Sequence, residues 1–289
     1  MQITQIVSAL FLSLVAVPTL KAQTEIDELA HALTVKLMAP DLVGGRKAEA
    51  GELPLSQWLG FCTATWVSLP GEEKGAVVTA AHCVDNGQSI SFNDRQYGTK
   101  HNGKCYKHPN YNDNTVQWDY AMCEMSTGPA SGAVVASFDA NPVKVGDGLL
   151  MAGYGRNPNA GTLHLGASVV YAIRGQDIVT NTSIALSSGD SGGVLYRGPT
   201  NLKSGPFLVV GINSRRAVGS VQSYFNQTVL ATEWIKSWSG NRNLKICGIN
   251  VSCGTIPDVP DRCLGDKEMI EYFESELRMA KDALAVCIK

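Results

Sequence analysis

Between residues 42 and 238, the apolar positions fall in short runs that are separated by turn residues. Four of these runs are predicted strands: 76–81, which is rich in small and β-branched residues, 148–152, 167–173 and 206–212. Turn signals include Asn86-Gly87, Asn102-Gly103 and Asn157-Pro158. No long run of helical periodicity interrupts this span. Together with 29 glycines and 12 prolines, the pattern predicts an all-β fold.

The chain begins with an apolar run at residues 6–20, broken only by two serines, a proline and a threonine. The run is too short for a comfortable membrane span, and the small residue Ala22 follows as a cleavage point. Residues 1–22 therefore predict a secretory signal peptide, with a buried hydrophobic strand as the alternative. We expect the protein to be secreted, to the extracellular space or the periplasm.

Composition narrows the class of protein. Hydrophobic residues make up 44% and charged residues 17% of the 289 residues, a globular balance. The formal net charge of −2 gives no indication of a nucleic-acid or anionic-membrane partner. The eight cysteines form an even number without a C-x-x-C pair, which favours disulfides over zinc and fits an oxidising compartment.

The clearest chemical motif is Gly189-Asp190-Ser191-Gly192-Gly193. Glycines around a serine allow a tight turn and bring backbone N–H groups close to a reacting carbonyl. A serine nucleophile needs a base, and histidine is the usual one. All five histidines of the chain precede Ser191: His31, His82, His101, His108 and His164.

This order excludes one class of hydrolase. The motif also fits the G-x-S-x-G elbow of α/β-hydrolases, but that fold places its histidine after the serine. Another known order of a catalytic triad is histidine, aspartate, serine. Three residues of the chain occur in this order: His82 in the segment 79–83, Asp119 in the segment 118–122, and Ser191. The alternative is three unrelated features, namely a buried histidine, a turn aspartate and a glycine-rich loop.

These three stretches resemble the signature blocks of chymotrypsin/trypsin-like serine endopeptidases. Other segments that resemble this family are Leu42-Val43-Gly44-Gly45, Cys62 with Cys83, His108-Pro109-Asn110-Tyr111, Gly153-Tyr154-Gly155, Gly211-Ile212-Asn213-Ser214 and Glu233-Trp234-Ile235. The resemblance implies a protease domain at 42–240. This domain would hold two antiparallel six-stranded β-barrels, at about 42–140 and 141–230, and a short closing helix at 229–238.

The resemblance also implies the roles of the site residues. Ser191 would attack the scissile carbonyl, His82 would carry the proton, and Asp119 would orient the imidazole. The N–H groups of Gly189 and Ser191 would form the oxyanion hole. We expect protein or peptide substrates and neither a metal nor an organic cofactor.

Residues 23–41 are then a propeptide. In the family, cutting before the residue equivalent to Leu42 frees an α-amino group that pairs with the aspartate preceding the nucleophile, here Asp190. Asp41 stands before this bond instead of lysine or arginine. We therefore expect an activating protease other than trypsin, or self-processing.

Specificity would depend on Ala185, Ser214, Arg215 and Arg216. Ala185 takes the place of the family's pocket-base residue, so a preference for lysine or arginine lacks its counter-ion. The two arginines stand where the family usually has Trp-Gly. Either both face solvent, or one lines the pocket and favours an acidic residue. A small apolar preference stays open beside the acidic one.

The cysteines predict disulfides in both parts of the chain. The family implies Cys62–Cys83. Adjacent strands favour Cys105–Cys123, with two buried thiols as the alternative. The last four cysteines lie in an extension at 241–289, where local closure favours Cys247–Cys253 and Cys263–Cys287 among three pairings.

The extension is also expected to hold a helix at 266–286. Its apolar stripe consists of Ile270, Phe273, Leu277, Ala280, Leu284 and Cys287. This stripe would dock on the protease domain or bind a partner.

The sequence thus predicts a secreted serine endopeptidase made as a zymogen. Two alternatives are a catalytically silent family member that binds a partner, and an adhesion protein that acts through its extension.

Overall fold

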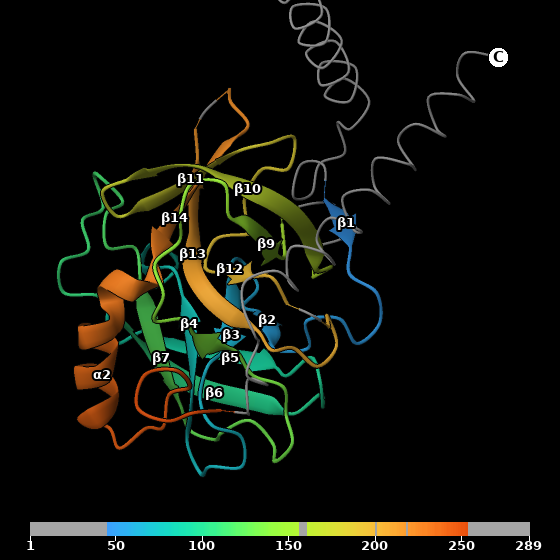
Figure 1. Cartoon of the computed structure of the whole chain (residues 1–289). Helices are drawn as coiled ribbons and strands as arrows, with labels where there is room; N and C mark the ends of the chain where they lie inside the picture. Colours follow the sequence, from blue (N-terminus) through green and yellow to red (C-terminus); the bar gives the residue numbers. More distant parts are fainter. Residues whose placement is uncertain (1–44, 156–160, 200, 218, 254–289) are drawn as a thin grey trace, which may run out of the picture. The chain divides into compact units, whose positions relative to one another are not determined.

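The computed structural model describes residues 45–155, 161–199, 201–217 and 219–253. The first barrel contains six antiparallel strands: β2 (Ser56–Trp58), β3 (Thr63–Trp66), β4 (Gly75–Thr79), β5 (Ser89–Asn93), β6 (Lys100–Lys107) and β7 (Ala121–Met125). Their order is β2-β3-β4-β7-β6-β5, and among the described residues no ladder pairs β2 with β5. These strands are labelled in Figure 1.

The second barrel has six further antiparallel strands: β9 (Gly148–Gly153), β10 (His164–Arg174), β11 (Asp177–Asn181), β12 (Val194–Arg197), β13 (Leu208–Arg216) and β14 (Gln222–Gln227). The order is β10-β11-β14-β13-β12-β9, and pairing of β9 with β10 closes the barrel. Two short strands add to it, β1 (Arg46–Lys47) on β10 and β8 (Ser137–Phe138) parallel to β13. The all-β, two-barrel prediction is confirmed.

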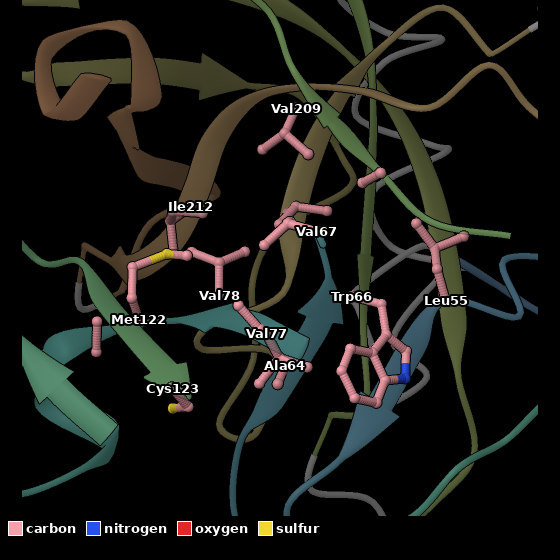
Figure 2. Packing of buried hydrophobic residues seen from close by; sticks show 14 of the residues in the cluster. Leu55, Ala64, Trp66, Val67, Val77, Val78, Met122, Cys123, Val209 and Ile212 are labelled. Atoms are coloured by element: carbon pink, nitrogen blue, oxygen red, sulfur yellow. The ribbon is translucent and has the colours of Figure 1, made fainter. Parts of the chain in front are cut away.

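Alternating and continuous apolar patterns build these strands in different ways. In β5, Ile90 and Phe92 are buried between exposed polar residues, as expected for a strand with one solvated face. Every residue of β4 is buried. Val77 and Val78 of β4 pack with residues of both barrels, among them Trp66 and Ile212 (Figure 2). Burying each such side chain stabilises the fold by roughly 1.5–3 kcal/mol.

One predicted turn is wrong. Asn102-Gly103 lies inside β6, where Gly103 is paired with Ile90 on one side and Met125 on the other. A Cβ on Gly103 would collide with the Met125 side chain and the backbone of Glu124. The glycine therefore permits close strand packing instead of a turn. Asn86-Gly87 forms a turn, as predicted, that is separated from β5 by one residue, and Asn157-Pro158 lies outside the described residues.

The closing helix and the residues after it lie against the barrels. A 3₁₀ turn, η2 (Thr228–Ala231), leads into α2 (Thr232–Gly240), which buries Ile235 and Trp238. The chain then continues into the first barrel, where Leu244, Ile246 and Cys247 are buried and the Cys247 N–H bonds the Val67 carbonyl at 2.9 Å. Among the described residues, no helix has the length and apolar character needed to cross a membrane.

Three disulfides are present in the described residues: Cys62–Cys83, Cys105–Cys123 and Cys247–Cys253. All three are pairs that the sequence predicts. Cys105 and Cys123 face each other directly across β6 and β7. Cys263–Cys287 and the helix expected at 266–286 lie outside the described residues, as do the expected signal peptide and propeptide.

Candidate active site

His82 and Asp119 form a close pair in the first barrel. His82 lies in the 3₁₀ turn η1 (Ala81–Cys83), which is separated from the end of β4 by one residue. Its Nδ1 is 2.8 Å from Asp119 Oδ2, and its backbone N–H donates to Asp119 Oδ1 at 2.9 Å. The carboxylate is fully buried, whereas the imidazole is 29% exposed. A proton held on Nδ1 leaves Nε2 as an acceptor on the exposed side.

Asp119 also contacts the second barrel. The Ser214 hydroxyl donates to Asp119 Oδ2 at 2.6 Å, and the Asp119 N–H donates to Asn226 Oδ1 at 2.7 Å. Both partners are buried. A hydrogen bond to an ionised carboxylate is one of the strong ones, so Ser214 holds the Asp119 side chain firmly, while Asn226 holds its backbone. The sequence predicted Ser214 as a substrate residue, and the structure adds its contact with Asp119.

A β-bulge explains how Ser214 reaches Asp119. On β13, Asn213 pairs with Phe225 and Arg215 pairs with Tyr224, so Ser214 is the extra residue of the ladder. Bulges redirect side chains next to functional sites. No sequence pattern marks this bulge, although the segment Gly211-Ile212-Asn213-Ser214 is one of those that resemble the family.

The Ser191 loop is held through its carbonyl groups. Thr63 Oγ1 donates to the Gly189 carbonyl at 2.9 Å, and the Thr63 N–H donates to the Ser191 carbonyl at 2.8 Å. Asn213 Nδ2 donates to the Asp190 carbonyl at 3.0 Å. Within the described part of the chain, the N–H groups of Gly189 and Ser191 have no protein acceptor. Two donors in a fixed loop can stabilise an anion.

The same loop packs against the segment that leads to His82. Gly192 has φ +79°, and a Cβ there would collide with the Thr79 hydroxyl and come within 2.8 Å of the Ala80 N. The structure therefore brings Ser191 into the region of His82. Among the described residues, no hydrogen bond joins the Ser191 hydroxyl to the imidazole.

Three further predicted residues, Ala185, Asp190 and Leu42, belong to the expected specificity pocket and activation ion pair. Ala185 is fully buried. Asp190 is also fully buried, and its Oδ2 accepts the Ser187 N–H at 2.7 Å. Leu42, its predicted partner, lies outside the described residues.

The two arginines differ from each other. Arg215 forms two hydrogen bonds with Asp177, at 2.5 and 3.3 Å, and its guanidinium lies 4.7 Å from the centre of the Tyr224 ring. Arg216 is exposed. From the sequence we expect either two solvent-facing arginines or one arginine in the pocket. The ion pair of Arg215 with Asp177 is neither of these.

One cluster of metal-type ligands lies beside the site. Cys62, His82 and Cys83 bring ligand atoms within 4.8 Å of one another. The two sulfurs are joined in a disulfide, so neither is available as a thiolate ligand. This cluster is therefore not a metal site.

Two six-stranded β-barrels, with a buried aspartate beside a partly exposed histidine on one and a glycine-framed serine on the other, form the architecture of the chymotrypsin fold. Comparison with family models gives a match to Trypsin over residues 42–235, and the chain belongs to this family. It is thus a serine-type endopeptidase, a peptide-bond hydrolase. A search of curated proteins gave no match.

Proposed function

We propose that the protein is a secreted endopeptidase, made as a zymogen, that uses His82, Asp119 and Ser191 as its triad. The observation that carries this proposal is the buried Asp119 carboxylate, which accepts bonds from the imidazole, the His82 N–H and the Ser214 hydroxyl. An anion so held fixes the imidazole tautomer and stabilises the imidazolium that forms during catalysis.

The reaction follows from this arrangement. Ser191 Oγ attacks the scissile carbonyl, and His82 Nε2 accepts its proton and returns it to the leaving amine. The N–H groups of Gly189 and Ser191 stabilise the tetrahedral oxyanion. Losing one such donor costs roughly 2.7–4 kcal/mol in a well-measured serine protease. Water then hydrolyses the acyl-enzyme by the same proton transfers in reverse order.

Activation and specificity are part of the proposal. Cutting between Asp41 and Leu42 frees an α-amino group that pairs with the buried Asp190. Ala185 supplies no anion for a lysine or arginine side chain, so primary specificity is not trypsin-like. Secretion is supported by the apolar run at residues 6–20 and by the three disulfides, which persist in oxidising compartments.

The test combines N-terminal sequencing of the secreted protein with labelling by a neutral fluorophosphonate, on wild type and Ser191→Ala. We expect an N-terminus at Leu42 and a label that Ser191→Ala abolishes. A processed protein that does not label would overturn the proposed triad and favour a silent binding protein. If Ser191→Ala is still cut completely at Asp41–Leu42 in purified form, processing depends on another protease.

A further inference from the structure

We propose that Arg215, Asp177 and Asn226 form a positioning network for Asp119, and that Arg215 acts through this network instead of binding an acidic substrate side chain. The inference rests on the proposed function, because it assigns these residues to the orientation of the proposed triad. It concerns three side chains of the second barrel, on β13, β11 and β14.

The first link is the carboxamide of Asn226. Its Oδ1 accepts the Asp119 N–H at 2.7 Å, and its Nδ2 donates to Asp177 Oδ1 at 3.0 Å. Asn226 and Asp177 are directly opposite in the β11–β14 ladder. Since Asn226 is fully buried, its amide has one favourable orientation, with oxygen towards Asp119 and nitrogen towards Asp177.

The second link fixes Asp177. Arg215 pairs with both carboxylate oxygens of Asp177, and the Tyr224 ring covers the guanidinium. The Asp177 side chain is 14% exposed and that of Arg215 is 32% exposed. This bidentate geometry suits arginine and not lysine. The charge of Arg215 is therefore paired with Asp177, and its planar face lies on the Tyr224 ring, both within the protein.

The bulge couples the network to the triad. It places Ser214 against Asp119 Oδ2 and the next residue, Arg215, against Asp177. Asp119 is thus held at its carboxylate by Ser214 and at its backbone by the Arg215–Asp177–Asn226 chain. A shift of Asp119 by about 1 Å is enough to cost roughly a hundredfold in rate.

The β10–β11 turn supports the same segment. Gln176 Oε1 accepts the Trp118 N–H at 2.7 Å. Trp118 has φ +56°, an uncommon value for a residue other than glycine, and precedes Asp119 directly. Positive φ at this position persists only where surrounding contacts hold it. The network therefore opposes relaxation of the Trp118–Asp119 backbone.

The experiment compares Arg215→Met and Arg215→Lys with wild type, in the full chain as secreted. The readouts are the rate of labelling by a neutral fluorophosphonate, and kcat and KM for two peptide anilides with glutamate or leucine before the scissile bond. We expect Arg215→Met to lower the labelling rate and kcat on both substrates by about tenfold to a hundredfold, with little change in KM. Arg215→Lys should recover part of kcat.

The control is Lys100→Met, which removes an exposed cation from the start of β6, away from β11, β13 and β14, and should leave all rates unchanged. Asp177→Asn keeps the side-chain shape and should reproduce the loss seen in Arg215→Met. Thermal unfolding checks that each variant is folded. If Arg215→Met labels at the wild-type rate and loses only cleavage after glutamate, Arg215 is a specificity residue and the network is refuted. Failure of the wild type to label refutes the proposed triad instead.

Discussion

At the scale of single residues, Gly192 is restricted both by its backbone and by its neighbours. It has φ +79° and lies against Thr79, Ala80 and the Thr63 carbonyl. We expect Gly192→Ala to lower the free energy of unfolding by about 2–4 kcal/mol, because strain at positive φ adds to a steric collision with backbone.

The matched control is Gly87→Ala, at φ +80° with nothing within 4 Å of the added Cβ. It should cost only about 1 kcal/mol, the strain term alone. Urea unfolding of both variants separates the two contributions. Equal losses would show that the packing against Thr79 and Ala80 does not matter.

His108 is the residue whose titration should be visible in the stability of the protein. It is buried, stacks on Trp118 at 4.6 Å and touches Tyr120 and Trp234, and its Nδ1 accepts the Asn110 N–H. Burial lowers its pKa from 6.5 to about 4. The unfolded chain therefore binds the proton more readily between these values.

It follows that His108 stabilises the fold fully above pH 6.5 and that this contribution is lost as the pH falls towards 4. By pH 4 the loss amounts to about 3 kcal/mol, at 1.36 kcal/mol per pKa unit. Urea unfolding from pH 7 to pH 4 should show a shallower decline in His108→Asn than in wild type. Parallel declines would mean that His108 keeps an ordinary pKa when folded.

At the scale of elements, the segment after α2 belongs to the first barrel. Residues 241–253 bury Leu244, Ile246 and Cys247 and add an antiparallel bridge between Ser68 and Ile246. A chain that ends at residue 240 should be less stable than one that ends at 253 by at least about 3 kcal/mol, from the lost apolar burial. Urea unfolding of the two truncations measures this difference directly. Superimposable transitions would show that the segment does not stabilise the barrel.

The elements also show how far the sequence predicts the structure. The four apolar runs predict strands that correspond to β4, β9, β10 and β13, and the motifs select His82 and Asp119, which the structure brings into contact. β6 was mistaken in part for a turn, because Lys100–Lys107 contains Asn102-Gly103 and lacks a clear apolar pattern. Its strand character comes from pairing on both edges, which local sequence does not encode.

Asn226 illustrates the same limit at the site. A single asparagine in a strand matches no sequence motif. Its contacts with Asp119 and Asp177 become visible only when the structure brings β11, β14 and the Asp119 segment together. Thr63 is similar, since its role depends on a loop 126 residues further along the chain.

At the scale of the whole molecule, Thr63 joins the two barrels. Its hydroxyl donates to the Gly189 carbonyl and accepts the Tyr154 N–H, both at 2.9 Å. Thr63→Val keeps the shape and leaves both groups buried without a partner, which costs about 1–3 kcal/mol for each. We expect a loss of about 2–4 kcal/mol in stability and slower fluorophosphonate labelling.

Thr180→Val is the comparison variant. Thr180 is fully buried, and its hydroxyl has no hydrogen-bond partner among the described residues. Removing that hydroxyl should be neutral or stabilising. A similar loss from both variants would mean that the inter-barrel hydrogen bonds of Thr63 contribute nothing specific.

Because the second barrel supports Asp119, completion of the site depends on the order in which the chain is synthesised and folds. His82 and Asp119 are synthesised and packed in the first barrel, but Ser214 and Asn226 arrive about a hundred residues later. Until both halves have folded and docked, Asp119 lacks its supports and the proposed nucleophile, Ser191, is not in place. With the proposed triad, proteolytic activity therefore requires complete folding, and we expect a half-made chain to cleave nothing around it.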